Sequence, residues 1–257
     1  MHELLELAKK AAWEAGAEIM RIYTDPAQDA QDFGVEKKSD NSPLTLADKT
    51  AHFCIERYLQ ETGIPILSEE GLHLPYEQRK GWTRLWVVDP LDGTKEFIKK
   101  NGEFTVNIAL VEDGSPVLGV IFIPVTGVMY YGIVGEGANK QIADETPVKI
   151  PIPTRRGTFV VVASRSHMSP ETEAYVEEVR RKHPQVELIS SGSSIKICLV
   201  AEGTADAYPR FAPTMEWDTA AGDAIARAAG KQVVDVQTGS PLVYNKEDLH
   251  NPWFLVE

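Results

Sequence analysis

The sequence has few of the features on which secreted, membrane-spanning and zinc-binding proteins depend. Its 257 residues contain only two cysteines, Cys54 and Cys198, too few for a disulfide framework or a thiolate zinc site. The longest apolar run, 117–125, is interrupted by a glycine and a proline and is far too short to cross a bilayer. The amphipathic segment 1–23 carries acidic residues from position 3, unlike a signal peptide. We therefore expect reduced cysteines, no transmembrane segment and a cytoplasmic location.

The sequence is also poor in positive charge. It has 26 Lys and Arg residues against 38 Asp and Glu residues, which gives a formal net charge of −12. Such a surface repels phosphate backbones, so we expect no nucleic-acid polymer as a partner. A small anionic substrate would need basic side chains or bound metal ions to reverse this charge locally. No feature of the sequence predicts an oligomeric state.

Hydrophobic periodicity predicts a mixed α/β chain. Helical spacing of apolar residues covers 1–23, 45–60, 170–182, 194–202 and 217–229. Short apolar segments indicate strands at 65–67, 85–88, 104–111, 117–123, 128–134, 158–163, 186–189, 205–208 and 232–236. Asp113-Gly114 and Thr126-Gly127 are hairpin signals, which predict an antiparallel meander between 104 and 134. Prolines at 147, 151 and 153 indicate a boundary within one domain, 1–257, between lobes of about 1–152 and 153–257.

The most informative stretch is Asp89-Pro90-Leu91-Asp92-Gly93-Thr94. An apolar strand ends at Asp89, the proline fixes φ, and the glycine permits a tight turn that brings both carboxylates to the same side. The N–H groups of Gly93 and Thr94 would then point outward at the start of a short helix. Carboxylates beside such amides suit a divalent cation that holds a phosphate. The alternative interpretation is an ordinary Asp-rich turn.

Further carboxylates stand at other strand ends and helix starts. Glu69 and Glu70 follow a short strand, Asp218 opens the last long helix, and Asp48 lies three residues after Thr45. Each has an ordinary interpretation: a solvated strand end, an acidic residue that complements a helix dipole, and a capping box. Four such elements in one α/β chain favour a shared site.

Taken together, three motifs resemble the inositol monophosphatase superfamily: Asp89–Thr94, the preceding Glu69-Glu70 and the later Trp217–Gly222. The resemblance covers essentially the whole chain. It implies an α/β fold, a layered α-β-α-β-α sandwich of the inositol monophosphatase and sugar phosphatase type. It also implies a magnesium-dependent, lithium-sensitive phosphatase of small phosphorylated metabolites.

Within the superfamily, the chain most resembles the bacterial 3′(2′),5′-bisphosphate nucleotidase branch. The stretches that carry this likeness are 95–98 with 101–107, 192–196 and 208–211. The resemblance implies hydrolysis of the 3′-phosphate of adenosine 3′,5′-bisphosphate, a by-product of sulfate activation and sulfotransfer, to AMP and phosphate. The substrate would be a small phosphorylated nucleotide.

The resemblance further implies a set of metal ligands in which Asp89 is shared. Glu69, Asp89 and the backbone carbonyl of Leu91 would hold one Mg²⁺. Asp89, Asp92 and Asp218 would hold a second Mg²⁺. Glu70 would assist a third ion through water, so that two or three Mg²⁺ ions are expected.

The expected reaction is an in-line attack by water, without a phosphoenzyme. Asp48, Thr94 and Glu69 form the expected catalytic set, because the resemblance implies that Asp48 orients Thr94 to position or deprotonate the attacking water. The amides of Gly93 and Thr94 would cradle phosphate oxygens.

The substrate-binding residues expected beside the metals come mostly from the second half of the chain. They are Gly93, Thr94, His167, Ser193, Lys196, Arg210 and Asp218. For Lys196 and Arg210 the alternative is a solvated cation, which is the usual state of these residues. For His167 the alternative is a structural histidine.

Two alternative functions stay open from the sequence. One is another phosphatase of the same superfamily that acts on inositol monophosphate or on a sugar bisphosphate; its metal site would be identical. The other is a sensor that binds a nucleotide or metal without turnover. Retention of Thr94 beside the full set of carboxylates argues against a sensor, which has no need to activate water.

Overall fold

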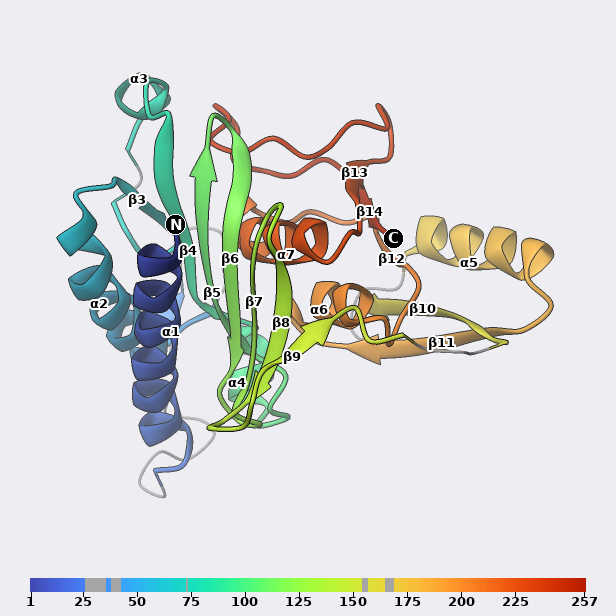
Figure 1. Cartoon of the computed structure of the whole chain (residues 1–257), viewed down its shortest axis with the longest axis horizontal. Helices are drawn as coiled ribbons and strands as arrows, with labels where there is room; N and C mark the ends of the chain where they lie inside the picture. Colours follow the sequence, from blue (N-terminus) through green and yellow to red (C-terminus); the bar gives the residue numbers. More distant parts are fainter. Residues whose placement is uncertain (26–35, 38–42, 73, 154–156, 165–168) are drawn as a thin grey trace.

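A seven-stranded sheet lies at the centre of the computed structural model, which describes residues 1–25, 36–37, 43–72, 74–153, 157–164 and 169–257. Its strands follow the order β3-β4-β5-β6-β7-β8-β9, with β3 and β4 parallel and every later pair antiparallel (Figure 1). The expected meander over 104–134 is therefore confirmed. The strand bounds are β3 (Ile66–Ser68), β4 (Arg84–Asp92), β5 (Thr105–Glu112), β6 (Ser115–Ile123), β7 (Val128–Ile133), β8 (Gly137–Ile142) and β9 (Val148–Ile150).

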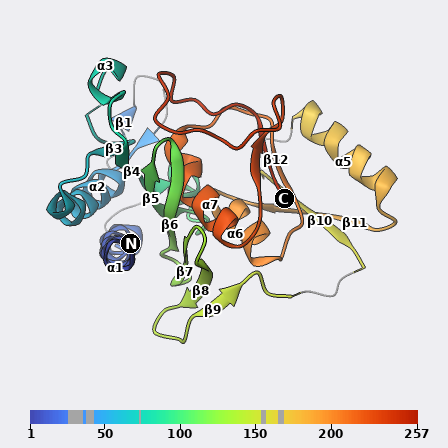
Figure 2. The same cartoon turned by 45° about the horizontal axis from the view of Figure 1, so that its top comes forward.

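Two helices, α1 (His2–Tyr23) and α2 (Leu46–Leu59), cover one face of this sheet (Figures 1 and 2). Side chains alternate along β4: Trp86 and Val88 pack against α1 and α2, whereas Leu85 and Val87 belong to the core on the opposite face. A strand buried on both faces has no polar side to show, which explains why β4 appears in the sequence as an uninterrupted apolar run.

The opposite face is covered by α6 (Ile195–Glu202) and α7 (Glu216–Ala228). Gly119 of β6 permits the close approach of α7, because a Cβ atom at this position would lie 2.2 Å from the carbonyl oxygen of Ala221. This packing matters for function, since it presses the first turn of α7 against the end of β4.

Beyond these helices lies a second layer of strands. β10 (Phe159–Ser164) and β11 (Val186–Ser191) are parallel and are covered by α5 (Pro170–Lys182). Figure 1 shows the resulting order of layers: α1 and α2, the large sheet, α6 and α7, the second strand layer, and α5. The expected α-β-α-β-α sandwich is confirmed.

A three-stranded sheet beside this layer differs from expectation. Its order is β12-β14-β13, with β12 (Tyr208–Arg210), β13 (Val233–Asp235) and β14 (Phe254–Val256). The expected strand at 205–208 is wrong except for its last residue: Ala207 forms only an isolated bridge to Val161. The sequence did not predict β14, because a three-residue strand carries too little pattern to be recognised.

The remaining described elements are short. They are β1 (Glu36–Lys37), β2 (Pro43–Leu44), a 3₁₀ turn (Gln60–Thr62), α3 (Tyr76–Arg79) and α4 (Thr94–Ile98). None of the helices described here has the length and apolarity needed to cross a membrane. Both cysteines are free thiols, with Cys198 buried and Cys54 partly buried. The division into lobes at about 152/153 stays a prediction, and one apolar core joins residues from both sides of it, for example Leu85 and Ile225.

Candidate metal and phosphate site

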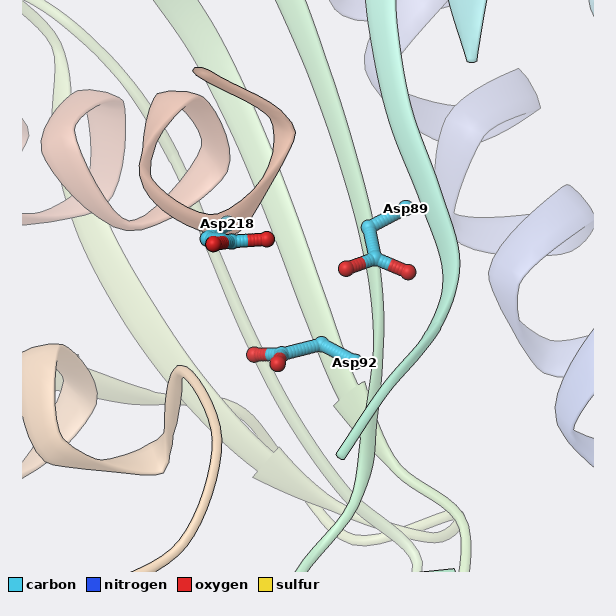
Figure 3. A group of neighbouring side chains, drawn as sticks. All are labelled: Asp89, Asp92 and Asp218. Atoms are coloured by element: carbon cyan, nitrogen blue, oxygen red, sulfur yellow. The ribbon is translucent and has the colours of Figure 1, made fainter. Parts of the chain in front are cut away.

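Three aspartates converge where the end of β4 meets the start of α7. Asp89 and Asp92 come from β4 and Asp218 from the first turn of α7. One carboxylate oxygen of each lies within 4.8 Å of the others, and Figure 3 shows the three side chains directed toward one another. Asp89 is only 1% exposed. The sequence motifs at 89–94 and 217–222, more than a hundred residues apart, are thus brought together.

The turn after Asp89 has the shape that its residues predict. The Asp89 carboxylate accepts the N–H of Leu91 at 3.0 Å, and the register with β5 shifts between Asp89 and Asp92. Such an irregularity changes the direction in which successive side chains point, so that residues three apart can face the same side. Gly93 then adopts φ = 97°, a conformation that favours glycine. Two carboxylates and the start of α4 therefore face one space.

Glu69, the residue that follows β3, lies beside Asp89. Its N–H donates to the carbonyl of Val88 at 3.1 Å, and its side chain shares a hydrogen bond with Asp89. The parallel pairing of β3 with β4 explains this contact, because parallel strands end at the same edge of a sheet. Glu70 follows at this edge and is partly buried.

Without a cation these carboxylates repel one another. Burial, followed by the charges of Glu69, Asp92 and Asp218, raises the pKa of Asp89 well above its usual value. Burial and Asp92 likewise raise the pKa of Asp218, although the N–H of Met215 partly opposes the rise. Closely spaced carboxylate oxygens are the ligands that a hard divalent cation prefers. The residues present therefore fit such a cation.

Asp48 connects the start of α2 to Thr94. One of its carboxylate oxygens accepts the N–H of Thr45 at 2.7 Å and the Thr45 hydroxyl, which completes a capping box. The other oxygen accepts the hydroxyl of Thr94 at 3.1 Å. The capping box and a hydrogen bond between Thr94 and Asp48 are thus both present, and the catalytic role expected for this pair stays a prediction. The Thr94 hydroxyl also lies 3.4 Å from the carbonyl oxygen of Leu91, the expected backbone ligand.

A cavity of about 150 Å³ opens beside the aspartates. Its lining includes many of the residues that the sequence analysis assigned to the substrate, together with apolar side chains such as Ile197 and Phe254. The assigned residues among them are Gly93, Ser193, Lys196, Arg210 and Asp218. His167, also assigned to the substrate, lies outside the described residues.

Lys196 is not a solvated cation, which corrects one interpretation left open above. It is 5% exposed, and its ammonium donates to the carbonyls of Ser193 at 2.6 Å and Ser191 at 3.3 Å. It lies 5.4 Å from the ring centroid of Tyr208. Burial, with a contribution from Arg210, lowers its pKa to about 8. A cation is therefore held in the cavity wall at a cost in desolvation that an anionic ligand would offset.

Two further donors at this wall have buried atoms without a hydrogen-bond partner among the described residues: the hydroxyl oxygen of Ser193 and Nε of Arg210. Ser193 also adopts φ = 45°, which is rare for a non-glycine residue and typical of functional turns. Buried polar atoms are usually satisfied, so both indicate a ligand with acceptor oxygens.

Sequence reasoning missed Ser194 and Asn107. The amide and hydroxyl of Ser194 both donate to Asp92, and the side-chain amide of Asn107 donates to the Ser194 hydroxyl. Both residues lie in stretches that carry the family resemblance, 101–107 and 192–196, but no role was assigned to either. Neither residue type is diagnostic of a metal site by itself.

A model of the inositol monophosphatase family matches residues 1–253. The chain belongs to the inositol monophosphatase family. Two curated relatives are named 3′(2′),5′-bisphosphate nucleotidase CysQ. The relative from Escherichia coli (strain K12) is 46% identical over 98% of this chain and 99% of its own length. The relative from Salmonella typhimurium is 47% identical with the same coverage.

Solved structures of this family show the same fold. The crystal structure of CysQ from Bacteroides thetaiotaomicron superimposes with a TM-score of 0.91 and 55% identity, over 99% of this chain and 97% of that one. The extragenic suppressor protein suhB from Bartonella henselae gives a TM-score of 0.77 at 25% identity, over 99% and 93% of the two chains. The resemblance inferred from the sequence motifs is therefore confirmed. The inositol monophosphatase family is metal-dependent, in agreement with the acidic cluster.

Proposed function

We propose that this protein is a Mg²⁺-dependent 3′(2′),5′-bisphosphate nucleotidase that hydrolyses the 3′-phosphate of adenosine 3′,5′-bisphosphate to AMP and phosphate. The observation that carries the proposal is a cavity with two unlike walls. The partly buried carboxylates of Asp92 and Asp218 form one wall, with Asp89 beside them, and Lys196, Arg210 and Ser193 form the other. A substrate with two phosphates fits such a cavity, with one phosphate at each wall. The full-length similarity to CysQ relatives supports the same choice of substrate.

On this proposal the carboxylate wall holds two Mg²⁺ ions. Glu69, Asp89 and the Leu91 carbonyl would hold one, and Asp89, Asp92 and Asp218 the other; Glu70 would assist a third ion through water. Bound Mg²⁺ would supply an acidified water and neutralise charge on the leaving oxygen. The raised pKa of Asp89 supports this assignment, since burial and the neighbouring carboxylates cause the rise and a bound divalent cation would oppose both effects.

The residues around the carboxylates would position water and phosphate. Because the Thr94 hydroxyl donates its proton to Asp48, its lone pairs are available to accept a proton or hydrogen bond from water. The amides of Gly93 and Thr94, at the start of α4, would receive phosphate oxygens. Lys196, Arg210 and Ser193 would hold the 5′-phosphate, which is not cleaved. His167 remains a predicted nucleotide contact.

Within the same family, a phosphatase of inositol monophosphate or of a sugar bisphosphate is the competing function. The buried ammonium of Lys196 disfavours inositol monophosphate, which has one phosphate and would leave this cation without an anionic partner. A metal or nucleotide sensor is disfavoured by the Asp48–Thr94 hydrogen bond, since binding alone needs no oriented hydroxyl.

Phosphate release from a panel of substrates tests the proposal. The panel contains adenosine 3′,5′-bisphosphate, 3′-phosphoadenosine 5′-phosphosulfate, inositol monophosphate and a sugar bisphosphate, each with and without Mg²⁺ and Li⁺. We expect the first compound to be hydrolysed fastest, only with Mg²⁺, and Li⁺ to inhibit. Faster release from inositol monophosphate would contradict the substrate, and an absence of Mg²⁺ dependence would contradict the mechanism. The predicted cytoplasmic location and the link to sulfate activation stay predictions.

A further inference from the structure

The turn Gly192–Ser194, which joins β11 to α6, packs against Glu103 and against the turn that carries Asp92. A Cβ atom at Gly192 would lie 2.8 Å from both the Cβ and the carbonyl oxygen of Glu103, which precedes β5. A Cβ atom at Gly93 would lie 3.3 Å from the Cβ of Ser193. The two halves of the chain are thus in close contact beside Asp92.

Ser194 makes two short hydrogen bonds across this contact. Its N–H and its hydroxyl both donate to the same carboxylate oxygen of Asp92, Oδ2, at 2.6 Å each. Ser194 is 3% exposed, so water hardly competes for these bonds. Charge-assisted bonds of this kind are among the stronger hydrogen bonds in proteins. They fix the orientation of the carboxylate and leave its other oxygen, Oδ1, for a cation.

Ser194 does not play the helix-capping role that its position suggests. Ser194 is the N-cap residue of α6, a position where a serine side chain commonly accepts a backbone N–H of the helix. Here the side chain forms no capping bond. Its hydroxyl is directed to Asp92 instead, so helix capping does not explain why a serine stands there.

The Ser194 hydroxyl also connects Asp92 to other elements of the site. It lies 2.8 Å from the carbonyl oxygen of Asp218 and accepts the side-chain amide of Asn107 at 2.9 Å. Asn107 is in turn fixed by the hydroxyl of Thr105 at 2.9 Å. The Ser194 hydroxyl has a single proton, for which the Asp92 carboxylate is the stronger acceptor. It therefore links β5 and α6 to the carboxylate at the end of β4 and lies against the start of α7.

We infer that Ser194 is a positioning residue for divalent-cation binding: through Oδ2 it holds the Asp92 carboxylate beside those of Asp89 and Asp218. The inference rests on the metal site of the proposed function. Both Ser193 and Ser194 line the cavity, and it is Ser194 that donates to Asp92. Groups that orient metal ligands typically contribute tenfold or more to metal affinity.

Mn²⁺ binding to the full chain, measured by calorimetry without substrate, tests the inference. We expect Ser194→Ala to raise the Mn²⁺ dissociation constant about tenfold. The matched control is Ser193→Ala, the same chemical change at the adjacent residue. It should leave the Mn²⁺ dissociation constant unchanged while it weakens nucleotide binding. Equal Mn²⁺ affinity in Ser194→Ala and the wild type would overturn the inference.

A second pair of variants separates the hydroxyl from the shape of the side chain. Ser194→Thr and Ser194→Val have nearly the same shape, and only the threonine retains a hydroxyl. We expect the threonine variant to bind Mn²⁺ about tenfold more tightly than the valine variant, even if both are less stable than the wild type. Equal affinities would refute the role of the hydroxyl. If the wild type binds no Mn²⁺, the metal site of the proposed function is refuted as well. If the wild type binds Mn²⁺ tightly and the Ser194 variants bind it equally well, only the positioning role of Ser194 is refuted.

Discussion

Two groups of buried or partly buried carboxylates in this protein differ in how their charge is balanced. Glu202 and Glu216 are 5% and 0% exposed, and each lies 2.6 Å from a lysine ammonium, that of Lys140 and of Lys246. Asp89, Asp92 and Asp218 meet at the end of β4, and no ion pair joins them to a lysine or arginine among the described residues. Arg210 is close enough to lower the pKa of Asp218 in part, but burial and Asp92 outweigh it.

The difference distinguishes carboxylates with a structural role, Glu202 and Glu216, from the carboxylates of the candidate site. Buried charges in proteins are normally paired or bound to metals, and a lysine partner supplies the pairing at Glu202 and Glu216. In the aspartate cluster, no lysine or arginine of the described part of the chain forms an ion pair with the three carboxylates. Acidic residues are common in the sequence, so their number does not reveal the site; the difference in pairing among the described residues does. Replacing members of either group, adding a cation and changing the pH each test this contrast.

Replacement of Asp89 by Asn should have the largest effect. Turnover should fall at least about 1,000-fold, because the shared ligand of both proposed ions loses its charge. In the presence of a chelator, the variant should nevertheless be more stable than the wild type by about 1 kcal/mol, since one of the repelling carboxylates is gone. Phosphate release and urea unfolding measure the two effects. Wild-type turnover in this variant would contradict the metal site.

Removal of a lysine partner should have the opposite effect on stability. Lys246→Met leaves Glu216 buried without its cation, and we expect the free energy of unfolding to fall by about 2–3 kcal/mol. This is at the low end for buried pairs because the Lys246 side chain is 28% exposed and two backbone N–H groups still donate to Glu216. The double variant with Glu216→Gln should recover part of the loss. If Lys246→Met were as stable as the wild type, the contrast between the two groups would be unsupported.

Addition of a divalent cation should stabilise the wild type specifically. At a Mg²⁺ concentration 100 times the dissociation constant, the free energy of unfolding should rise by about 2.7 kcal/mol. Asp89→Asn should gain less than about 1 kcal/mol under the same conditions, and Lys246→Met should gain as much as the wild type. Urea unfolding with Mg²⁺ and with chelator provides the measurement. An equal gain in Asp89→Asn would place the cation elsewhere.

The smallest predicted effect concerns Lys196, in the cavity wall opposite the carboxylates. The pKa of Lys196 is lowered to about 8, so its ammonium is mostly charged at pH 7 and mostly neutral at pH 9. We expect the KM for adenosine 3′,5′-bisphosphate to rise about tenfold over this range, because the charged form binds the 5′-phosphate. Lys196→Ala should show a raised KM at pH 7 without this pH dependence, and an unchanged requirement for Mg²⁺.

An analogue without the 5′-phosphate is the control for Lys196. Its KM should be insensitive both to the substitution and to pH over the same range. An unchanged preference between the nucleotide and this analogue in Lys196→Ala would show that Lys196 does not contact the 5′-phosphate.

The parts of the fold that the sequence predicted are those with strong local patterns. The bounds of α5 agree with expectation, because the hydroxyl of Ser169 accepts the N–H of Thr172 and Pro170 occupies the first helical position. The β5–β6 hairpin agrees as well, since Asp113 and Gly114 adopt the positive φ values, 48° and 73°, that the turn requires. In contrast, β14 and the true start of β12 depend on pairing with each other, which no local pattern encodes.

The candidate site divides in the same way. The proximity of Asp89 and Asp92 was predictable because a strand, a proline and a glycine fix one short turn. The motifs at Glu69 and Asp218 were recognisable as parts of the same site only through their resemblance to a family. Contacts such as Ser194 with Asp92 join residues about a hundred positions apart through common side chains, and they leave no signature in a single sequence.

The chemistry of this protein could be inferred from its residues alone: which carboxylates stand at strand ends and helix starts, and that they match a metal-dependent phosphatase family. The electrostatics of the site depend on the tertiary structure. It buried Lys196 in the cavity wall, directed the Ser194 hydroxyl away from its own helix, and left the aspartates without a basic partner among the described residues. Residue types and local turns depend on a few neighbouring residues, so they can be recognised in the sequence. Burial and charge balance arise only when segments far apart in the sequence pack together.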